Sequence, residues 1–194
     1  MIITIPLPKA NRSRRARGFT LVEMMVAATL GSFLLLAVLT SFLFLGRTGA
    51  NMQNYTEMEV QARRTIETFA EDVRMAKDAT WNSATSLTLT VVNSSGTTAS
   101  RTYTYNSSTG TFTRLAGTTT TTLLTGISTF SFTAYKINTD TIDLTNSATL
   151  ASASSLTKQI QISLRAIRTT RTVSDATNSV ISARFILRNK KVTA

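Results

Sequence analysis

The longest apolar segment of the chain covers residues 24–45, which are 22 residues without a charge. As a helix this segment would be about 33 Å long, and the hydrocarbon core of a bilayer is about 30 Å thick. The segment therefore predicts a membrane-spanning helix. It does not fit a secretory signal, whose apolar stretch is only about 7 to 15 residues long.

A helical pattern continues after the apolar segment. Apolar residues recur every three or four positions from residue 55 to residue 76, and charged residues occupy the other helix faces. The apolar positions are Tyr55, Met58, Ala62, Ile66, Phe69, Val73 and Ala76. Joined to the apolar segment, this stripe predicts one helix from Phe19 to about Lys77, about 90 Å long. Gly46 and Gly49 are its expected weak points, because glycine destabilises a helix interior.

After Trp81 the apolar period changes to two, and Thr, Ser and β-branched residues dominate. Strands are expected within 86–92, 126–135, 158–168 and 180–191, and a hairpin over 101–115 with its turn at 106–110. The pattern predicts an antiparallel sheet that packs its apolar face on the helical stripe, an α+β fold. The polar segments GTTTTT (117–122) and TNSATLASASS (145–155) are expected to be mobile surface loops.

The formal net charge of +11 is concentrated near the apolar segment. The first 18 residues contain no acid and five basic residues, namely Lys9, Arg12, Arg14, Arg15 and Arg17. Without these five, 16 basic residues face 10 acidic ones, a balance of +6. The positive-inside rule predicts that the basic end stays in the cytoplasm and that the chain from about Arg47 onward crosses the membrane.

One acidic residue, Glu23, lies at the N-terminal end of the apolar segment. A carboxylate in a membrane helix is unfavourable and usually marks a partner. If the chain were cut after Gly18, Phe19 would become the first residue, and its new amino group would lie one helical turn from Glu23. In a stack of similar helices, Glu23 of one subunit could then neutralise the terminal amine of the next subunit.

The stretch GFTLVE, Gly18 to Glu23, follows a basic leader and precedes an unbroken apolar helix. In this it resembles the prepilin processing site of type IV pilins and type II secretion pseudopilins. The resemblance implies cleavage between Gly18 and Phe19 by a membrane-embedded prepilin peptidase, and N-methylation of Phe19. It further implies assembly with other pilins or pseudopilins into a filament anchored in the inner membrane, with Glu23 as the assembly residue. The mature domain is then expected in the periplasm or outside the cell.

The resemblance divides the chain into four parts. Residues 1–18 are a cleaved basic leader, 19–45 a transmembrane and assembly helix, 46–79 an amphipathic helix, and 80–194 an antiparallel sheet domain with Ser/Thr-rich loops. The later segments AEDVRMA, TGISTFSFTAY, IQISLRAI and ARFILRN resemble minor pilins of the PilW kind and the J-type minor pseudopilin. The absence of Cys departs from many major pilins and favours a minor subunit. Both prolines lie in the leader, so no kink of the kind seen in many major pilins is expected in the span.

The composition argues against an enzyme. The chain has no His and no Cys, which removes the commonest general base and the thiol nucleophile. Asn138, Asp140 and Asp143 offer oxygen ligands, but this segment lacks the glycine and distal glutamate of a calcium loop, so a solvated loop is favoured. We therefore expect no catalytic residue, no cofactor and no metal.

Two alternatives remain open at this point. One is an ordinary single-pass signal anchor that carries an extracytoplasmic binding domain. The other adds DNA contact to filament assembly, because basic residues after Lys158 greatly outnumber acids. The candidate phosphate contacts are Arg165, Arg168, Arg184, Arg188, Lys190 and Lys191. Strand residues alternate between faces, so these side chains need not converge.

Overall fold

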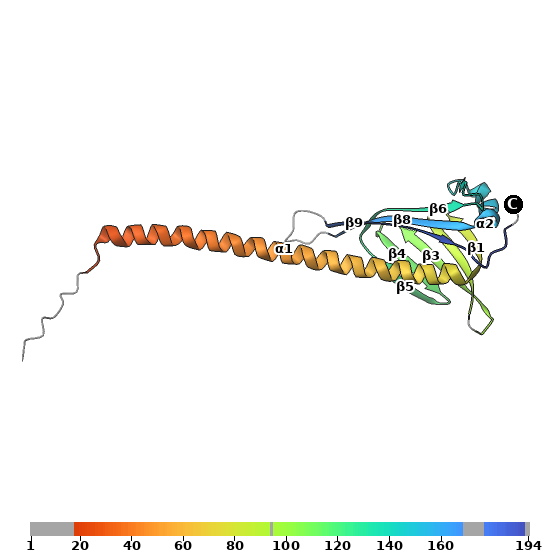
Figure 1. Ribbon diagram of the computed structural model, residues 1–194, viewed down its shortest axis with the longest axis horizontal. Helices are drawn as coiled ribbons and strands as arrows, with labels where there is room; N and C mark the ends of the chain where they lie inside the picture. Colours follow the sequence, from red (N-terminus) through yellow and green to blue (C-terminus); the bar gives the residue numbers. More distant parts are fainter. Residues whose placement is uncertain (1–17, 94, 169–176, 193–194) are drawn as a thin grey trace, which may run out of the picture. The chain divides into compact units, whose positions relative to one another are not determined.

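The structure is a computed structural model that describes residues 18–93, 95–168 and 177–192. The described residues form an α+β fold in which the long helix α1 (Leu21–Met75) precedes two antiparallel sheets (Figure 1). The chain divides into two units, Met1–Gly46 and Arg47–Ala194. The second unit contains the C-terminal part of α1 and both sheets. The fold class expected from the sequence is confirmed.

The first sheet has five strands in the order β1-β2-β3-β4-β5. They are β1 (Ala76–Ser83), β2 (Ser86–Val92), β3 (Thr98–Asn106), β4 (Thr111–Ala116) and β5 (Thr119–Leu124). The second sheet has the order β7-β6-β8-β9. Its strands are β6 (Ile127–Tyr135), β7 (Thr141–Ile142), β8 (Gln159–Arg168) and β9 (Thr177–Ile186), and the short helices η1 (Ser147–Thr149) and α2 (Leu150–Leu156) lie between β7 and β8. All neighbouring strands are antiparallel.

The alternation of apolar and polar residues in the sequence correctly predicts which strand faces are buried. Leu87, Leu89 and Val91 alternate as buried residues along β2. In β8, Ile160 and Ile162 are likewise fully buried. The hairpin forms as expected, with β3 and β4 paired from Asn106↔Thr111 to Arg101↔Ala116.

The helical stripe and both sheets share one core. Phe69 of α1 is fully buried and makes an edge contact with Tyr103 of β3, with ring centroids 5.0 Å apart, and a stacked contact with Phe132 of β6 at 6.0 Å. Trp81 of β1 also contacts Phe132. Such pairs add to the burial of apolar area, the main favourable contribution to folding. The second half of α1 is therefore held by the sheets.

A buried carboxylate also ties α1 to the first sheet. Asp72 is 3% exposed and accepts hydrogen bonds from Arg114 Nε (2.7 Å), Arg114 Nη2 (3.0 Å) and Tyr103 OH (2.6 Å). The bonds to Asp72 raise the pKa of Arg114, and burial together with the bond to Asp72 raises the pKa of Tyr103. The carboxylate of Asp72 is thus engaged by donors from β3 and β4.

Four expectations from the sequence were wrong in detail. The helix ends at Met75 rather than near residue 77 or 79, because buried Ala76 pairs with Val91 and begins β1. The apolar face packs against two sheets rather than one. Residues 117–122 were expected to be a loop, but most of them belong to β5, where threonine suits a paired strand. Residues 145–155 include η1 and most of α2, which is anchored by the fully buried Ala153.

Candidate processing and assembly site

Gly18 and Phe19 lie just before α1 and are not helical. The Phe19 side chain is 84% exposed, and a Cβ added to Gly18 would meet no atom within 4 Å. No described residue therefore covers the peptide bond between Gly18 and Phe19, which is accessible. The basic residues of the leader, Lys9 to Arg17, lie outside the described residues.

Helix α1 begins with a reciprocal cap between Thr20 and Glu23. Thr20 is the N-cap, since its carbonyl accepts the first helical hydrogen bond from Met24 N. Its hydroxyl accepts a hydrogen bond from Glu23 N (3.2 Å). In return, Glu23 Oε2 accepts hydrogen bonds from Thr20 N (2.8 Å) and from the Thr20 hydroxyl (3.0 Å). This is a capping box, which supplies partners to main-chain donors that a helix start leaves free.

The cap answers part of the question that Glu23 raises in the sequence. The carboxylate already has a local partner in a single chain, before any second subunit is present. Sequence reasoning missed this role, although the signal was available, because Thr20 and Glu23 have the T-x-x-E spacing of a capping box. Both hydrogen bonds from Thr20 use Oε2, and no described residue donates to Oε1 in the same carboxylate.

The first half of α1 presents an apolar surface. Phe33 is 70% exposed and Leu35 is 71% exposed, and their neighbours along the helix are similarly open. The hydroxyl groups of this segment donate hydrogen bonds to main-chain carbonyls of the helix. Thr29 donates to Val26 O, and Ser32 donates to Ala28 O. Because these polar groups are satisfied internally, they suit a hydrocarbon environment. Among the described residues, α1 is the helix that is long and apolar enough to cross a membrane.

The candidate phosphate contacts fall into different environments. Arg165 in β8 and Arg188 and Lys191 after β9 are exposed. Arg168 forms an ion pair with Glu57 of α1. Arg184 is exposed but stacks over the ring of Tyr135 at 3.8 Å and donates to Gln161.

The burial of Lys190 contradicts its prediction as a candidate phosphate contact. Its side chain is 5% exposed, and its ammonium donates to Ala79 O (3.3 Å) and Ser154 O and pairs with Asp78 Oδ1 (3.0 Å). Burial acts to raise the pKa of Asp78, but the hydrogen bond from Lys190 and the Ala79 N–H together hold this pKa below its usual range. Lys190 therefore joins β1, α2 and the C-terminal segment, and it cannot reach a phosphate without leaving this site.

The candidate calcium loop is organised by its own hydrogen bonds. Asn138 Nδ2 donates to Asp140 Oδ2 (2.7 Å). Asp143 accepts from the N–H and the hydroxyl of Thr145, and these bonds lower the pKa of Asp143. Within residues 18–93, 95–168 and 177–192, no three His, Cys, Asp or Glu side chains are grouped so that they could hold a metal ion.

Comparison with known families bears on the same N-terminal region. The model of the prokaryotic N-terminal methylation motif matches residues 13–39, which contain Gly18, Phe19, the capping box and most of the apolar segment. A search of curated proteins gave no match. The chain thus carries the prokaryotic N-terminal methylation motif at the start of a long apolar helix that is followed by antiparallel sheets.

Proposed function

We propose that the chain is a minor pilin or pseudopilin, a structural subunit of a type IV pilus or of a type II secretion pseudopilus. Prepilin peptidase cleaves it between Gly18 and Phe19, Phe19 becomes N-methylated, and the mature subunit joins an inner-membrane-anchored filament with its sheet domain in the periplasm or outside the cell. The observation that supports this most directly is the position of Glu23. It lies in a capping box and is the fifth residue after an accessible Gly18–Phe19 bond.

The cap and an intermolecular charge pair are compatible. Cleavage before Phe19 leaves Thr20 in place, so the capping box does not depend on the leader. The cap uses Oε2 of Glu23, and Oε1 remains able to accept a hydrogen bond from the terminal amine of a neighbouring subunit. We therefore assign two roles to Glu23, which are to start the helix within one chain and to bind the amine of the next chain.

Two substitutions at Glu23 separate these roles. Glu23→Gln keeps an amide oxygen that can complete the capping box, but it removes the charge. Glu23→Ala removes both the charge and the cap. We expect both variants to be cleaved and both to be depleted from sheared filaments to a similar extent, as measured by immunoblot against the membrane pool. Thr20→Val, which keeps the carboxylate and loses the hydroxyl, should be incorporated better than either. Normal incorporation of Glu23→Gln would refute the charge pair and leave only the cap.

The cleavage assignment has its own test. N-terminal sequencing of wild-type protein from membranes should begin at Phe19, and Gly18→Val should block processing because a branched side chain crowds the scissile bond. A wild-type protein that still begins at Met1 would instead support the plain signal anchor. A chain beginning at Phe19 in the Gly18→Val variant would contradict the role given to Gly18.

DNA contact remains a second candidate that would accompany filament assembly. The exposed basic residues Arg165, Arg188 and Lys191 are the ones left to support it. Retention of DNA that decreases with salt, and that is lost when these three charges are reversed, is the expected result. Absence of binding at low salt would remove this candidate.

A further inference from the structure

The two sheets have four edge strands, and three of them are covered or short. In β1, Trp81 N donates to Ser154 Oγ of α2 (2.8 Å). In β5, Leu123 O accepts a hydrogen bond from Thr65 Oγ1 of α1 (3.0 Å). Strand β7 is only two residues long. Edges that are covered in this way, or that are so short, are poor templates for another strand.

The fourth edge, β9, is long and open. It is ten residues long and pairs with β8 without a register shift from Gln159↔Ile186 to Arg168↔Thr177. Within the described residues, no hydrogen bond reaches the main chain of β9 on the side away from β8. The strand contains no proline, and its exposed face carries Val180 (75% exposed) and Ile186 (55% exposed). Edge strands are normally protected by bulges, proline or several charges, and β9 has only Arg184.

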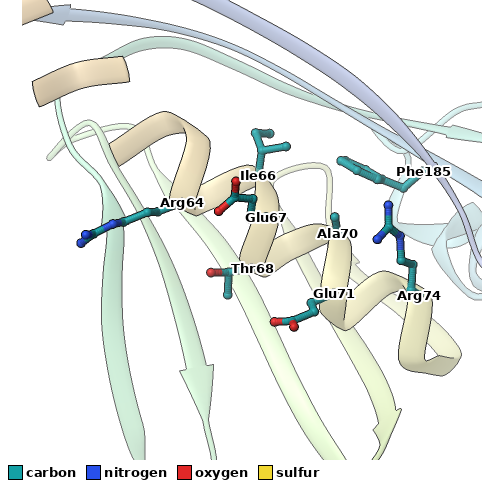
Figure 2. Close-up of a pocket in the computed structure, with 8 residues that line it drawn as sticks. All are labelled: Arg64, Ile66, Glu67, Thr68, Ala70, Glu71, Arg74 and Phe185. Atoms are coloured by element: carbon teal, nitrogen blue, oxygen red, sulfur yellow. The ribbon is translucent and has the colours of Figure 1, made fainter. Parts of the chain in front are cut away.

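Two grooves run between β9 and α1. The first has a volume of about 350 Å³ and places Ile181 of β9 near Ala62 and Ile66 of α1. The second, of about 620 Å³, places Phe185 near Ala70 and Arg74, as Figure 2 shows. The inward side chains of a strand added beside β9 would point toward these partly apolar surfaces.

The α1 side of the first groove carries charges of alternating sign. Glu59, Arg63 and Glu67 all line it, and none of them forms an ion pair with another residue of the described ranges. They are four residues apart, so they repeat about every 6 Å along the helix. Side chains on one face of a strand repeat about every 6.6 to 6.8 Å. A strand with basic, acidic and basic residues at alternate positions would therefore match this row.

We propose that β9 accepts an extended strand from a different protein chain, and that the side chains of this strand facing α1 are basic, acidic and basic in turn. The added strand continues the second sheet through main-chain hydrogen bonds, and its long side chains lay their stems on the groove floor while their charged ends pair with α1. The proposal does not depend on cleavage or on Glu23.

A second copy of this chain does not fit the site. Its other described edges are covered or short, so it could offer only β9. The charged residue that β9 carries is Arg184 alone, so a second β9 cannot supply a basic, acidic and basic row in either pairing direction.

The test uses full-length protein in detergent and two dye-labelled peptides in fluorescence anisotropy. The probe is Thr-Lys-Val-Glu-Val-Lys-Val-Thr, and the control is Thr-Glu-Val-Lys-Val-Glu-Val-Thr. In each peptide the order of the charged residues is the same in either chain direction, so the test does not depend on the direction in which the peptide binds. We expect the probe to bind about tenfold more tightly than the control. General attraction to this basic protein would favour the control, which is the more acidic peptide, so the expected preference cannot come from net charge. Equal binding, or preference for the control, would overturn the proposal.

Two further measurements identify the edge and the charge row. The N–H groups of alternate residues in a strand point to the same side, so N-methylation of alternate residues blocks one side of the probe's main chain. Two such probes are compared, one methylated at the odd positions and one at the even positions. One of them should lose binding and the other should keep it. The Glu59→Lys/Arg63→Glu/Glu67→Lys variant, whose three substitutions are on exposed positions, should reverse the preference and bind the control peptide. Retained binding by both methylated probes, or an unchanged preference in a variant shown to be folded by circular dichroism, would contradict the assigned site.

Discussion

Replacement of Arg114 by methionine would leave the carboxylate of Asp72 buried with a single donor. In the native protein Asp72 is 3% exposed and accepts two hydrogen bonds from Arg114 and one from Tyr103. After Arg114→Met only the Tyr103 hydroxyl would remain. Because Asp72 lies on α1 and its donors lie on β3 and β4, the substitution weakens the contact between the helix and the first sheet.

The size of the effect follows from the burial of the pair. Removal of one partner from a buried ion pair destabilises a protein by about 3 to 5 kcal/mol. The Arg114 side chain is 23% exposed, so water screens part of its charge, and we take the lower end, about 3 kcal/mol. For a chain of this size each kcal/mol lowers the melting temperature by about 2 to 4 °C, which predicts a decrease of about 6 to 12 °C.

The measurement is thermal unfolding of the full-length protein, followed by near-UV circular dichroism. The matched control is Asp72→Leu/Arg114→Met, which removes both charges and leaves no buried carboxylate. It should recover at least half of the lost stability, because the main penalty in the single variant is the unpaired charge. An Arg114→Met variant that melts within about 2 °C of wild type would refute this reasoning, and so would a double variant less stable than the single one.

Three other predictions concern the sheet junction and the C-terminal segment. Gly126→Ala should destabilise the protein by more than about 1 kcal/mol, because Gly126 has a φ of +74° and a Cβ there would lie 2.6 Å from Ile167 O; normal denaturant stability would contradict this. Lys190→Met should lower the free energy of unfolding by about 2 kcal/mol, because the carbonyls of Ala79 and Ser154 lose their donor. The control Lys191→Met changes an exposed position and should have little effect. The pKa of Asp78 is lowered on folding, so its ionised carboxylate stabilises the folded protein. This stabilisation is present above the ordinary Asp pKa of about 3.9 and is lost as the pH falls through the lower folded value. The stability difference between wild type and Asp78→Asn should therefore shrink below about pH 4, and a constant difference would contradict this.

The sequence was sufficient for features that depend on local periodicity. The apolar stripe of α1, the alternation in β2 and β8, and the β3–β4 hairpin each follow from a repeat of 3.6 or 2 residues and a turn. These patterns identify which side chains face a core. They do not identify which strands share a sheet, because that depends on contacts between distant segments.

The expectations that failed share this dependence on distant contacts. Strand β5 is mostly threonine, and it is a strand because β4 pairs with it and Thr65 of α1 binds its main chain. The Ser- and Ala-rich α2 is held by the burial of Ala153 and by the contact of Ser154 with β1. Lys190 looks like one of several exposed charges in the sequence, and only the fold brings Asp78 and two carbonyls around it.

The start of α1 shows why a polar residue can be required at the edge of an apolar segment for more than one reason. A helix start leaves main-chain donors without partners, and such groups are most unfavourable where water is scarce. Thr20 and Glu23 satisfy two of these donors within a single chain, so the carboxylate has a function as soon as the protein is inserted. A charge pair with a second subunit can form only later, during assembly. Helix initiation requires an oxygen acceptor at position 23, whereas the proposed charge pair requires a negative charge there. Glutamine meets the first requirement and fails the second, so Glu23→Gln separates the helix cap from the proposed charge pair.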